Sequence, residues 1–130
     1  DLLAASDYVV LTVPLTAQTR GMIDAAALAS MRPDAVLINV GRGPLVDEPA
    51  LIEALRTRRI AAAALDVFMR EPLPADSELW DIENLVMTPH IAAGTDHYYE
   101  RATDIFCANL RHYLAGEPLD FLVDPTVTAG

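Results

Sequence analysis

Four side chains suited to acid–base chemistry or anion binding follow apolar runs in this 130-residue chain: Arg42, Asp66, Glu71 and His90. Arg42 stands between two glycines, which let the backbone turn sharply and let a ligand approach closely. Its planar guanidinium suits a carboxylate. His90 can donate a proton near neutral pH, and a nearby carboxylate such as Glu71 stabilises its charged form. Arg42, Glu71 and His90 could therefore bind an α-keto acid, protonate its carbonyl oxygen and orient the proton donor.

Each of these residues also has an ordinary structural interpretation. Arg42 could bridge to a surface acid, His90 could bond to backbone at the end of a strand, and Glu71 could be a solvated loop acid. Considered singly, these interpretations compete well with a catalytic role. The set carries more weight than its members, because all of them follow strand-like segments.

The elements that must position these residues alternate between strands and helices. Four apolar runs predict strands, at 8–13, 35–40, 60–68 and 84–90. Asp24 and Asp47 are placed to cap short helices, and the proline-rich stretch 70–80 predicts a loop. A long helix is predicted from Thr95 to Leu114, with Gly116 as its stop and with Cys107, near its apolar face, expected in the core. Because each strand is apolar on both faces, the pattern predicts a parallel sheet covered by helices, in the doubly wound α/β class. Ligands bind at the carboxyl ends of such strands.

Composition narrows the classes of function. Apolar residues make up 52% of the chain and charged residues 22%, which predicts a soluble globular protein. The net charge of -10 argues against nucleic acid and anionic membranes as partners, because both require clustered Lys and Arg. No apolar stretch approaches a membrane span, and nothing suggests export. The single cysteine, Cys107, excludes an internal disulfide framework and fits the cytoplasm. No metal site is predicted.

Several segments carry a family resemblance that covers almost the whole chain. In order and spacing, "LINVGRGPLVDEPALIEAL", "AALDVFMREPLP", "LW" and "TPHIAAGT" resemble the signature segments of the NAD-dependent D-isomer-specific 2-hydroxyacid dehydrogenases. The wording "DVFMREPLP" with "LW" is most similar to the glyoxylate/hydroxypyruvate reductase branch. The resemblance implies an oxidoreductase that uses NAD or NADP and acts on a small 2-hydroxy or 2-keto acid. It also implies the second half of a Rossmann NAD-binding domain.

The resemblance implies roles for individual residues. Arg42 matches the substrate-binding arginine, His90 the general acid of keto-acid reduction, and Glu71 the glutamate that pairs with this histidine. Asp66 matches an aspartate that contacts the nicotinamide end of the cofactor, and Trp80 lies near the active-site loop in some members. The segments that match cofactor-lining positions, besides Arg42, Asp66 and His90, are Val13 and Pro14, Val40 and Gly41, and Ala92 and Ala93.

Two family features have no counterpart here. The chain has no Gly-x-Gly-x-x-Gly turn to hold a pyrophosphate, and no residue that would select NAD or NADP. The N-terminal substrate-binding lobe is also absent, so we expect the chain to be a C-terminal fragment that binds cofactor weakly on its own. In this interpretation residues 1–114 form the C-terminal part of the dinucleotide-binding domain with a crossover helix. Residues 115–130 form a tail returning towards the missing lobe.

Two other functions stay open. The first is an NAD(H)-responsive binding module of the co-repressor kind without metabolic turnover, which could retain the Arg42, Glu71 and His90 set. The second keeps the fold but changes the chemistry, as in Rossmann-type hydrolases or amino-acid dehydrogenases, although these would not be expected to combine the "GRG", "DVF" and "TPH" segments. The family resemblance further implies a homodimer.

Overall fold

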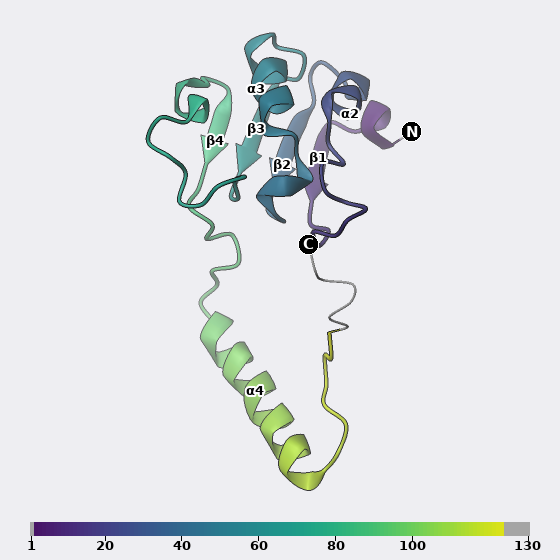
Figure 1. Cartoon of the computed structure of the whole chain (residues 1–130), viewed down its shortest axis with the longest axis vertical. Helices are drawn as coiled ribbons and strands as arrows, with labels where there is room; N and C mark the ends of the chain where they lie inside the picture. Colours follow the sequence, from purple (N-terminus) through teal and green to yellow (C-terminus); the bar gives the residue numbers. More distant parts are fainter. Residues whose placement is uncertain (1, 124–130) are drawn as a thin grey trace. The chain divides into compact units, whose positions relative to one another are not determined.

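The computed structural model describes residues 2–123, which form two compact units, residues 2–92 and 93–123. The first unit contains α1 (Leu2–Ala5), β1 (Tyr8–Leu11), α2 (Ala25–Ser30), β2 (Val36–Asn39), the 3-10 helix η1 (Gly43–Leu45), α3 (Glu48–Arg56), β3 (Ala62–Leu65), the 3-10 helix η2 (Glu78–Asp81) and β4 (Leu85–Met87). The second unit contains α4 (Tyr98–Ala115). Figure 1 shows these elements, coloured along the chain.

The four strands form one parallel sheet in the order β1-β2-β3-β4. Tyr8 pairs with Val36, Val36 with Ala62, and Ala63 with Leu85, so the strands are nearly in step and end at the same edge. This arrangement confirms the predicted α/β class with a parallel sheet and a long C-terminal helix. All four predicted strands are present, each shorter than its apolar run.

Burial alternates along the strands, so one face of the sheet is packed and the other is open. On the open face Tyr8 is 68% exposed, Val10 52% and Val86 66%. The sequence analysis expected both faces to be covered. Along the chain, each strand lies next to the preceding one, always in the same direction across the sheet. Right-handed crossovers therefore place all of the segments that connect the strands on one face (Figure 1). No crossover within residues 2–92 is therefore available for the opposite face.

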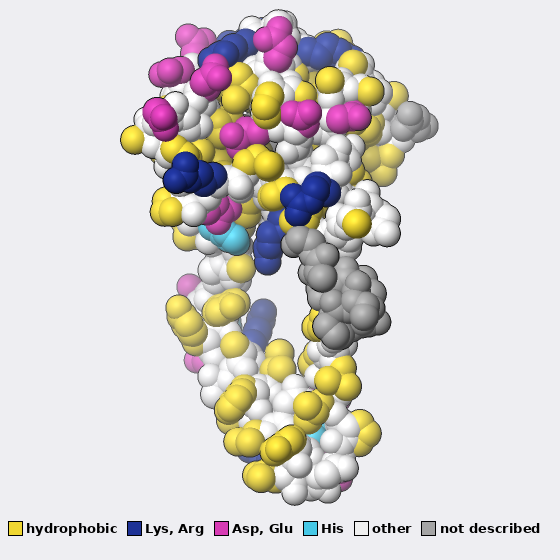
Figure 2. Space-filling model, viewed as in Figure 1, with side chains coloured by type: hydrophobic (Ala, Val, Ile, Leu, Met, Phe, Trp, Pro, Cys, Tyr) yellow, Lys and Arg dark blue, Asp and Glu magenta, His cyan; other side chains and the backbone are white. Residues whose placement is uncertain are grey.

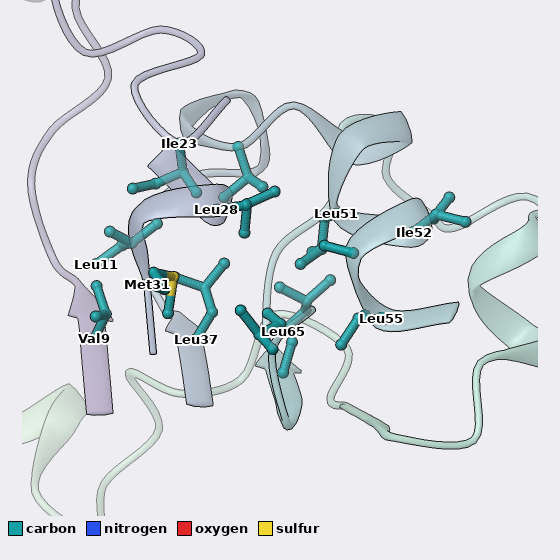
Figure 3. Close-up of a cluster of buried hydrophobic side chains, with 14 of the residues drawn as sticks. Val9, Leu11, Ile23, Leu28, Met31, Leu37, Leu51, Ile52, Leu55 and Leu65 are labelled. Atoms are coloured by element: carbon teal, nitrogen blue, oxygen red, sulfur yellow. The ribbon is translucent and has the colours of Figure 1, made fainter. Parts of the chain in front are cut away.

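The packed face holds the hydrophobic core. Leu28 from α2 and Leu51 and Leu55 from α3 meet Leu37 and its neighbours on the strands, and all four leucines are at most 1% exposed. Figure 3 shows these side chains pointing into one layer between the helices and the sheet. Burying such a side chain contributes roughly 1.5–3 kcal/mol. This layer fixes the strand ends relative to one another.

The two short helices begin where the sequence predicts. The Asp24 carboxylate accepts the N–H of Ala27 at 2.8 Å, and the Asp47 carboxylate accepts that of Ala50 at 3.2 Å. Pro49 occupies the first turn of α3, where its missing N–H leaves no donor unpaired. Each cap is worth about 1 kcal/mol. The start of α3 therefore lies at a fixed distance from Arg42.

The segment between β3 and β4, which the sequence analysis treated as a proline-rich loop, contains a helical turn. In η2 the Ser77 hydroxyl accepts the N–H of Leu79 at 3.3 Å, and Leu79 is fully buried. The loop prediction was wrong here because one buried leucine and a serine cap outweigh the flanking prolines.

The second unit consists of α4 and the segment that follows it. Gly116 adopts a left-handed conformation with φ 70° and ends the helix. The side-chain amide of Asn109 then bonds both backbone groups of Asp120, at 2.7 and 3.2 Å. The expectation that Cys107 lies in the core was wrong, because no residue of α4 is buried and Cys107 is half-buried. Residues 124–130 of the predicted tail lie outside the described residues.

Candidate active site

The predicted site residues of the first unit lie where the parallel strands end, because all four strands run in the same direction (Figure 1). Arg42 follows β2, Asp66 directly follows β3, Glu71 lies in the loop after it, and His90 follows β4. The core beneath the sheet therefore supports three consecutive loops that carry these four polar side chains.

A buried amide shapes the turn that carries Arg42. Asn39 is 1% exposed; its side-chain oxygen accepts the N–H of Gly41 at 3.1 Å, and its side-chain nitrogen donates to the carbonyl of Arg42 at 3.0 Å. The guanidinium of Arg42 is exposed and donates to the carbonyl of Gly41 at 2.7 Å. Among residues 2–123 it forms no ion pair with a carboxylate, so its charge is available to a ligand.

The glycines on either side of Arg42 allow the backbone itself to pack closely. A Cβ at Gly43 would overlap the carbonyl group of Phe68, and one at Gly41 would lie 3.2 Å from the carbonyl oxygen of Val13. The sequence analysis assigned these glycines to close approach by a ligand. At Gly43 the neighbour is instead the loop after β3, so this glycine joins the Arg42 turn to the loop that carries Glu71.

Three contacts hold that loop. The Glu71 carboxylate accepts the N–H of Phe68 at 3.0 Å, closing the loop on itself. Glu48, in the first turn of α3, accepts the N–H of Met69 at 3.3 Å. Together with the Gly43 contact, these bonds fix the position from which Glu71 reaches His90.

His90 and Glu71 form a close pair. The Nδ1 atom of His90 lies 2.7 Å from a carboxylate oxygen of Glu71, and the two side chains are 46% and 35% exposed. This bond, followed by the bond from the Phe68 N–H, holds the pKa of Glu71 below its usual range, and the charge of Arg42 adds a smaller contribution. An ionised carboxylate only accepts, so Nδ1 carries the proton and Nε2 is the atom that faces a ligand.

Asp66 holds the turn on which His90 sits. Its buried carboxylate accepts the hydroxyl of Thr88 at 2.6 Å and the N–H groups of Ile91 and Ala92 at 2.9 and 2.8 Å. Burial acts to raise the pKa of Asp66, but these three donors lower it below the usual range. His90 has φ 55°, a left-handed conformation that costs roughly 1–2 kcal/mol for a residue with a Cβ. Its N–H donates to the carbonyl of Asp66 at 2.8 Å, so one residue secures this strained turn.

A pocket of about 720 Å³ opens beside the histidine–glutamate pair. Its lining combines that pair with apolar side chains, among them Phe68, Leu73, Trp80 and Met87. Trp80 is 55% exposed and donates its indole N–H to the carbonyl of Pro74 at 2.8 Å, which fixes one wall. Arg42 is not among the residues that line this pocket.

The positions predicted to line a cofactor differ in their exposure. Val13 and Val40 are exposed on neighbouring strand ends, joined by a bond of 3.3 Å from the Val40 N–H to the carbonyl of Leu11. Pro14 and Ala92 are exposed, and Gly41 is buried under its own turn. Ala93 is the first residue of the second unit, so nothing is said of its place relative to this edge.

Sequence reasoning assigned no role to Asn39, Glu48 or Thr88 in shaping this site. One signal was readable for Asn39, because an amide ending an apolar run is expected to be buried and hydrogen-bonded. The bonds from Glu48 to Met69 and from Thr88 to Asp66 join residues 21 and 22 positions apart. Such bonds depend on the folded sheet and leave no local signature.

Residues 2–123 contain neither a candidate metal site nor a candidate membrane-spanning helix. No group of three or more His, Cys, Asp or Glu side chains in this range is arranged to hold a metal ion. No described helix combines the length and the apolar character needed to cross a membrane.

Comparison with known proteins gives one family. Residues 1–92 match the family described as D-isomer specific 2-hydroxyacid dehydrogenase, NAD binding domain. A curated relative, glyoxylate/hydroxypyruvate reductase B of Pectobacterium atrosepticum, is 49% identical over 129 residues. The match covers 97% of this chain but 39% of that relative, so the chain spans about two fifths of the relative's length.

Solved structures give the same result. A D-isomer specific 2-hydroxyacid dehydrogenase from Xanthobacter autotrophicus Py2, in complex with NADPH and MES, is 48% identical with a TM-score of 0.87, covering 95% of this chain and 50% of that one. An NADPH-dependent glyoxylate/hydroxypyruvate reductase from Sinorhizobium meliloti, in complex with NADP and sulfate, is 34% identical with a TM-score of 0.87, covering 97% and 41%.

Proposed function

Because this chain belongs to the D-isomer-specific 2-hydroxyacid dehydrogenases, within their NAD-binding domain, we propose that it contributes the acid–base and carboxylate-binding groups of an NAD(P)-dependent 2-keto acid reductase. Glyoxylate and hydroxypyruvate are the first substrates to test, since similar proteins carry the name glyoxylate/hydroxypyruvate reductase. The product is the corresponding 2-hydroxy acid, and the reverse reaction oxidises it.

One observation carries this proposal: the 2.7 Å contact between His90 Nδ1 and Glu71 at the carboxyl ends of the strands. The ionised Glu71 accepts from Nδ1 and thereby fixes the orientation of the ring. Nε2 then holds a proton that it can give to a carbonyl oxygen, which becomes the hydroxyl of the product. In the reverse direction the neutral ring accepts that proton.

Arg42 provides the charge that a 2-keto acid requires. Its guanidinium is exposed, and its bond to the Gly41 carbonyl leaves further N–H groups for a carboxylate. A bidentate contact would hold the carboxylate and thereby orient the neighbouring carbonyl. The division of roles is then clear: Arg42 binds, His90 transfers a proton and Glu71 positions His90.

The strand ends fit a nicotinamide ring. Val13 and Val40, which are 38% and 39% exposed, follow the ends of the neighbouring strands β1 and β2, and exposed apolar side chains there would support a flat ring beside polar groups. These two residues, with Pro14 and Ala92, would hold the ring. A bound reduced nicotinamide supplies two electrons and one hydrogen to the carbonyl carbon. Asp66 already accepts three hydrogen bonds from the segment that follows β4, so its side chain has little capacity left for the cofactor.

The test is the oxidation of NADH and NADPH with glyoxylate, hydroxypyruvate and pyruvate by the protein expressed from its whole gene. Glu71→Gln keeps the size of the side chain but removes the carboxylate that holds Nδ1 of His90. We expect this variant to reduce the keto acids more slowly, because the ring loses the charged partner that orients it.

Glu100→Gln is the matched control, since Glu100 forms a similar contact with His97 at 2.9 Å in α4. We expect wild-type rates from it. Equal rates in the wild type and Glu71→Gln across the pH range would contradict the role of the pair. Binding of NADH without turnover of any 2-keto acid would instead support a cofactor-responsive binding module.

The domain arrangement, oligomeric state and location follow as further parts of the proposal. We propose residues 1–114 as part of the cofactor domain with its crossover helix, residues 115–130 as a tail towards a substrate-binding lobe, and a homodimer in the cytoplasm. The open apolar face of the sheet is compatible with burial against more protein. Light scattering on the purified protein tests the dimer, and a mass of one subunit would contradict it.

A further inference from the structure

The side-chain amide of Asn39 forms hydrogen bonds through both its oxygen and its nitrogen to the backbone around Arg42. Its oxygen accepts the N–H before Arg42, from Gly41, and its nitrogen donates to the carbonyl of Arg42 itself. At 1% exposure it has almost no contact with solvent, so a lost bond would not be replaced by water. The Val40–Gly41 peptide and the Arg42–Gly43 peptide are therefore both bonded to one buried group.

The backbone of Asn39 extends this link to the next strand. Its carbonyl accepts the N–H of Asp66 at 3.0 Å, and the carbonyl of Asp66 accepts the N–H of His90 at 2.8 Å. A short chain of hydrogen bonds thus joins the turn that carries Arg42 to the turn that carries His90. A shift at Asn39 would alter the spacing between these two side chains.

Arg42 depends on this backbone support because its side chain has little of its own. The guanidinium is exposed, and its one hydrogen bond to the described protein goes to the carbonyl of Gly41, inside the turn that Asn39 fixes. The turn that Asn39 fixes therefore sets the backbone from which this side chain leaves the sheet edge.

We propose that Asn39 is a positioning residue that aims Arg42 at the carboxylate of the substrate. This inference rests on the proposed function. It predicts that loss of the amide weakens binding of the keto acid more than it slows the chemical step, because His90 and Glu71 keep their contact.

The test compares Asn39→Ser with Asn84→Ser in the protein expressed from its whole gene. Serine is too short to reach the Arg42 carbonyl, and its hydroxyl accepts the N–H two residues on more weakly than the asparagine oxygen does. Asn84 makes two comparable bonds, to the carbonyls of Leu55 and Ala61 at 3.3 and 2.9 Å, at the edge where the strands begin. Its loss controls for a general loss of stability.

We expect Asn39→Ser to raise KM for the keto acid about tenfold with a smaller change in kcat, the pattern of lost binding. Asn84→Ser should leave both constants near wild type while lowering the melting temperature similarly. Hydrogen exchange at the Gly41 amide should accelerate in Asn39→Ser only. Calorimetric titration with oxamate, a pyruvate-like carboxylate, should show weaker binding to Asn39→Ser.

Equal KM values for the two variants, or oxamate binding that both variants weaken alike, would overturn the inference. The proposed function fails separately, if the wild type reduces no 2-keto acid. In that case oxamate binding and Gly41 exchange still decide the role of Asn39. Unchanged exchange at Gly41 in Asn39→Ser would overturn it without any assay of turnover.

Discussion

Arginines differ in their partners between the two edges of the sheet: the first edge, where the strands begin, and the second edge, where they end. At the edge where the strands begin, Arg32 pairs with Asp34 at 2.8 Å, and two further pairs join Arg56 to Glu78 at 2.7 Å and Arg58 to Glu83 at 3.4 Å. Figure 2 shows basic and acidic side chains interleaved over this end of the first unit. At the edge where the strands end, Arg42 has no carboxylate partner among the described residues.

Polar side chains that bond the backbone differ in the same way. Asn84, at the first edge, bonds carbonyls that end α3 and precede β3, so it closes gaps between elements. Asn39 and Asp66, at the second edge, bond the turns that carry Arg42 and His90. At the first edge, charged side chains pair with one another. At the second edge, buried groups hold the turns from which charged side chains extend towards a ligand.

The largest effect that this comparison predicts is on turnover at the second edge. His90→Gln removes the proton donor, and we expect kcat for keto-acid reduction to fall about 10²–10⁴-fold with little change in melting temperature. His97→Gln, which alters the pair in α4, should keep wild-type kcat. If His90→Gln retains full turnover in a steady-state assay, the second edge is not the acid–base site.

The next effect should appear at Gly43, where the two functional turns touch. Gly43→Ala forces the Arg42 turn away from the Phe68 carbonyl, with a cost of about 3 kcal/mol, and should lower turnover as well. Gly21→Ala provides the control: it has no atom within 4 Å of a new Cβ but a φ of 64°, so it costs roughly 1–2 kcal/mol through the backbone alone.

Urea unfolding and turnover measured on both glycine variants separate the two contributions. We expect the activity per folded molecule to fall in Gly43→Ala and to stay constant in Gly21→Ala. Equal activity per folded molecule would show that the contact between the two turns has no catalytic importance.

A smaller effect, on stability, is expected at Asp66. Asp66→Asn weakens charge-assisted bonds to Thr88, Ile91 and Ala92 and should cost about 2 kcal/mol at neutral pH. The pKa of Asp66 is lowered by folding, so its contribution is present above the ordinary aspartate value and is lost as the pH falls through the lower, folded value. In urea unfolding the wild type should therefore lose more stability than Asp66→Asn below about pH 4. Parallel losses in the two proteins would contradict this assignment.

The smallest effect belongs to the first edge. Arg58→Ala removes a pair whose side chains are 59% and 88% exposed, and it should change the free energy of unfolding by less than about 0.5 kcal/mol. Turnover should not change. Thermal unfolding at low and high salt checks this expectation, and a loss much larger than it would show that the first edge also depends on its charges.

Much of the scaffold could be predicted from local patterns. Apolar runs located all four strands, and Asp24, Asp47 and Gly116 marked helix ends through bonds within a few residues. The pairing of Glu71 with His90 was expected from the family resemblance and has the predicted proximity. These features depend on residues near one another in the chain or on a motif with fixed spacing.

The features that were missed depend on contacts between distant segments. Gly43 was expected to admit a ligand, but it meets the backbone of Phe68, 25 residues later along the printed sequence. The open face of the sheet was missed because an apolar run reveals its residues and not the side on which each crossover passes. The buried leucine of η2 was hidden in a segment whose prolines favoured a loop.

The alternation of burial along the strands also has a practical consequence for handling the protein. Tyr8, Val10 and Val86 point away from the core layer, so their polarity can be changed without opening a cavity. Threonine at these positions keeps a high preference for strands while reducing the apolar area that drives self-association. Substitutions on the open face of the sheet can therefore reduce self-association at high concentration, whereas the melting temperature depends on the packed face.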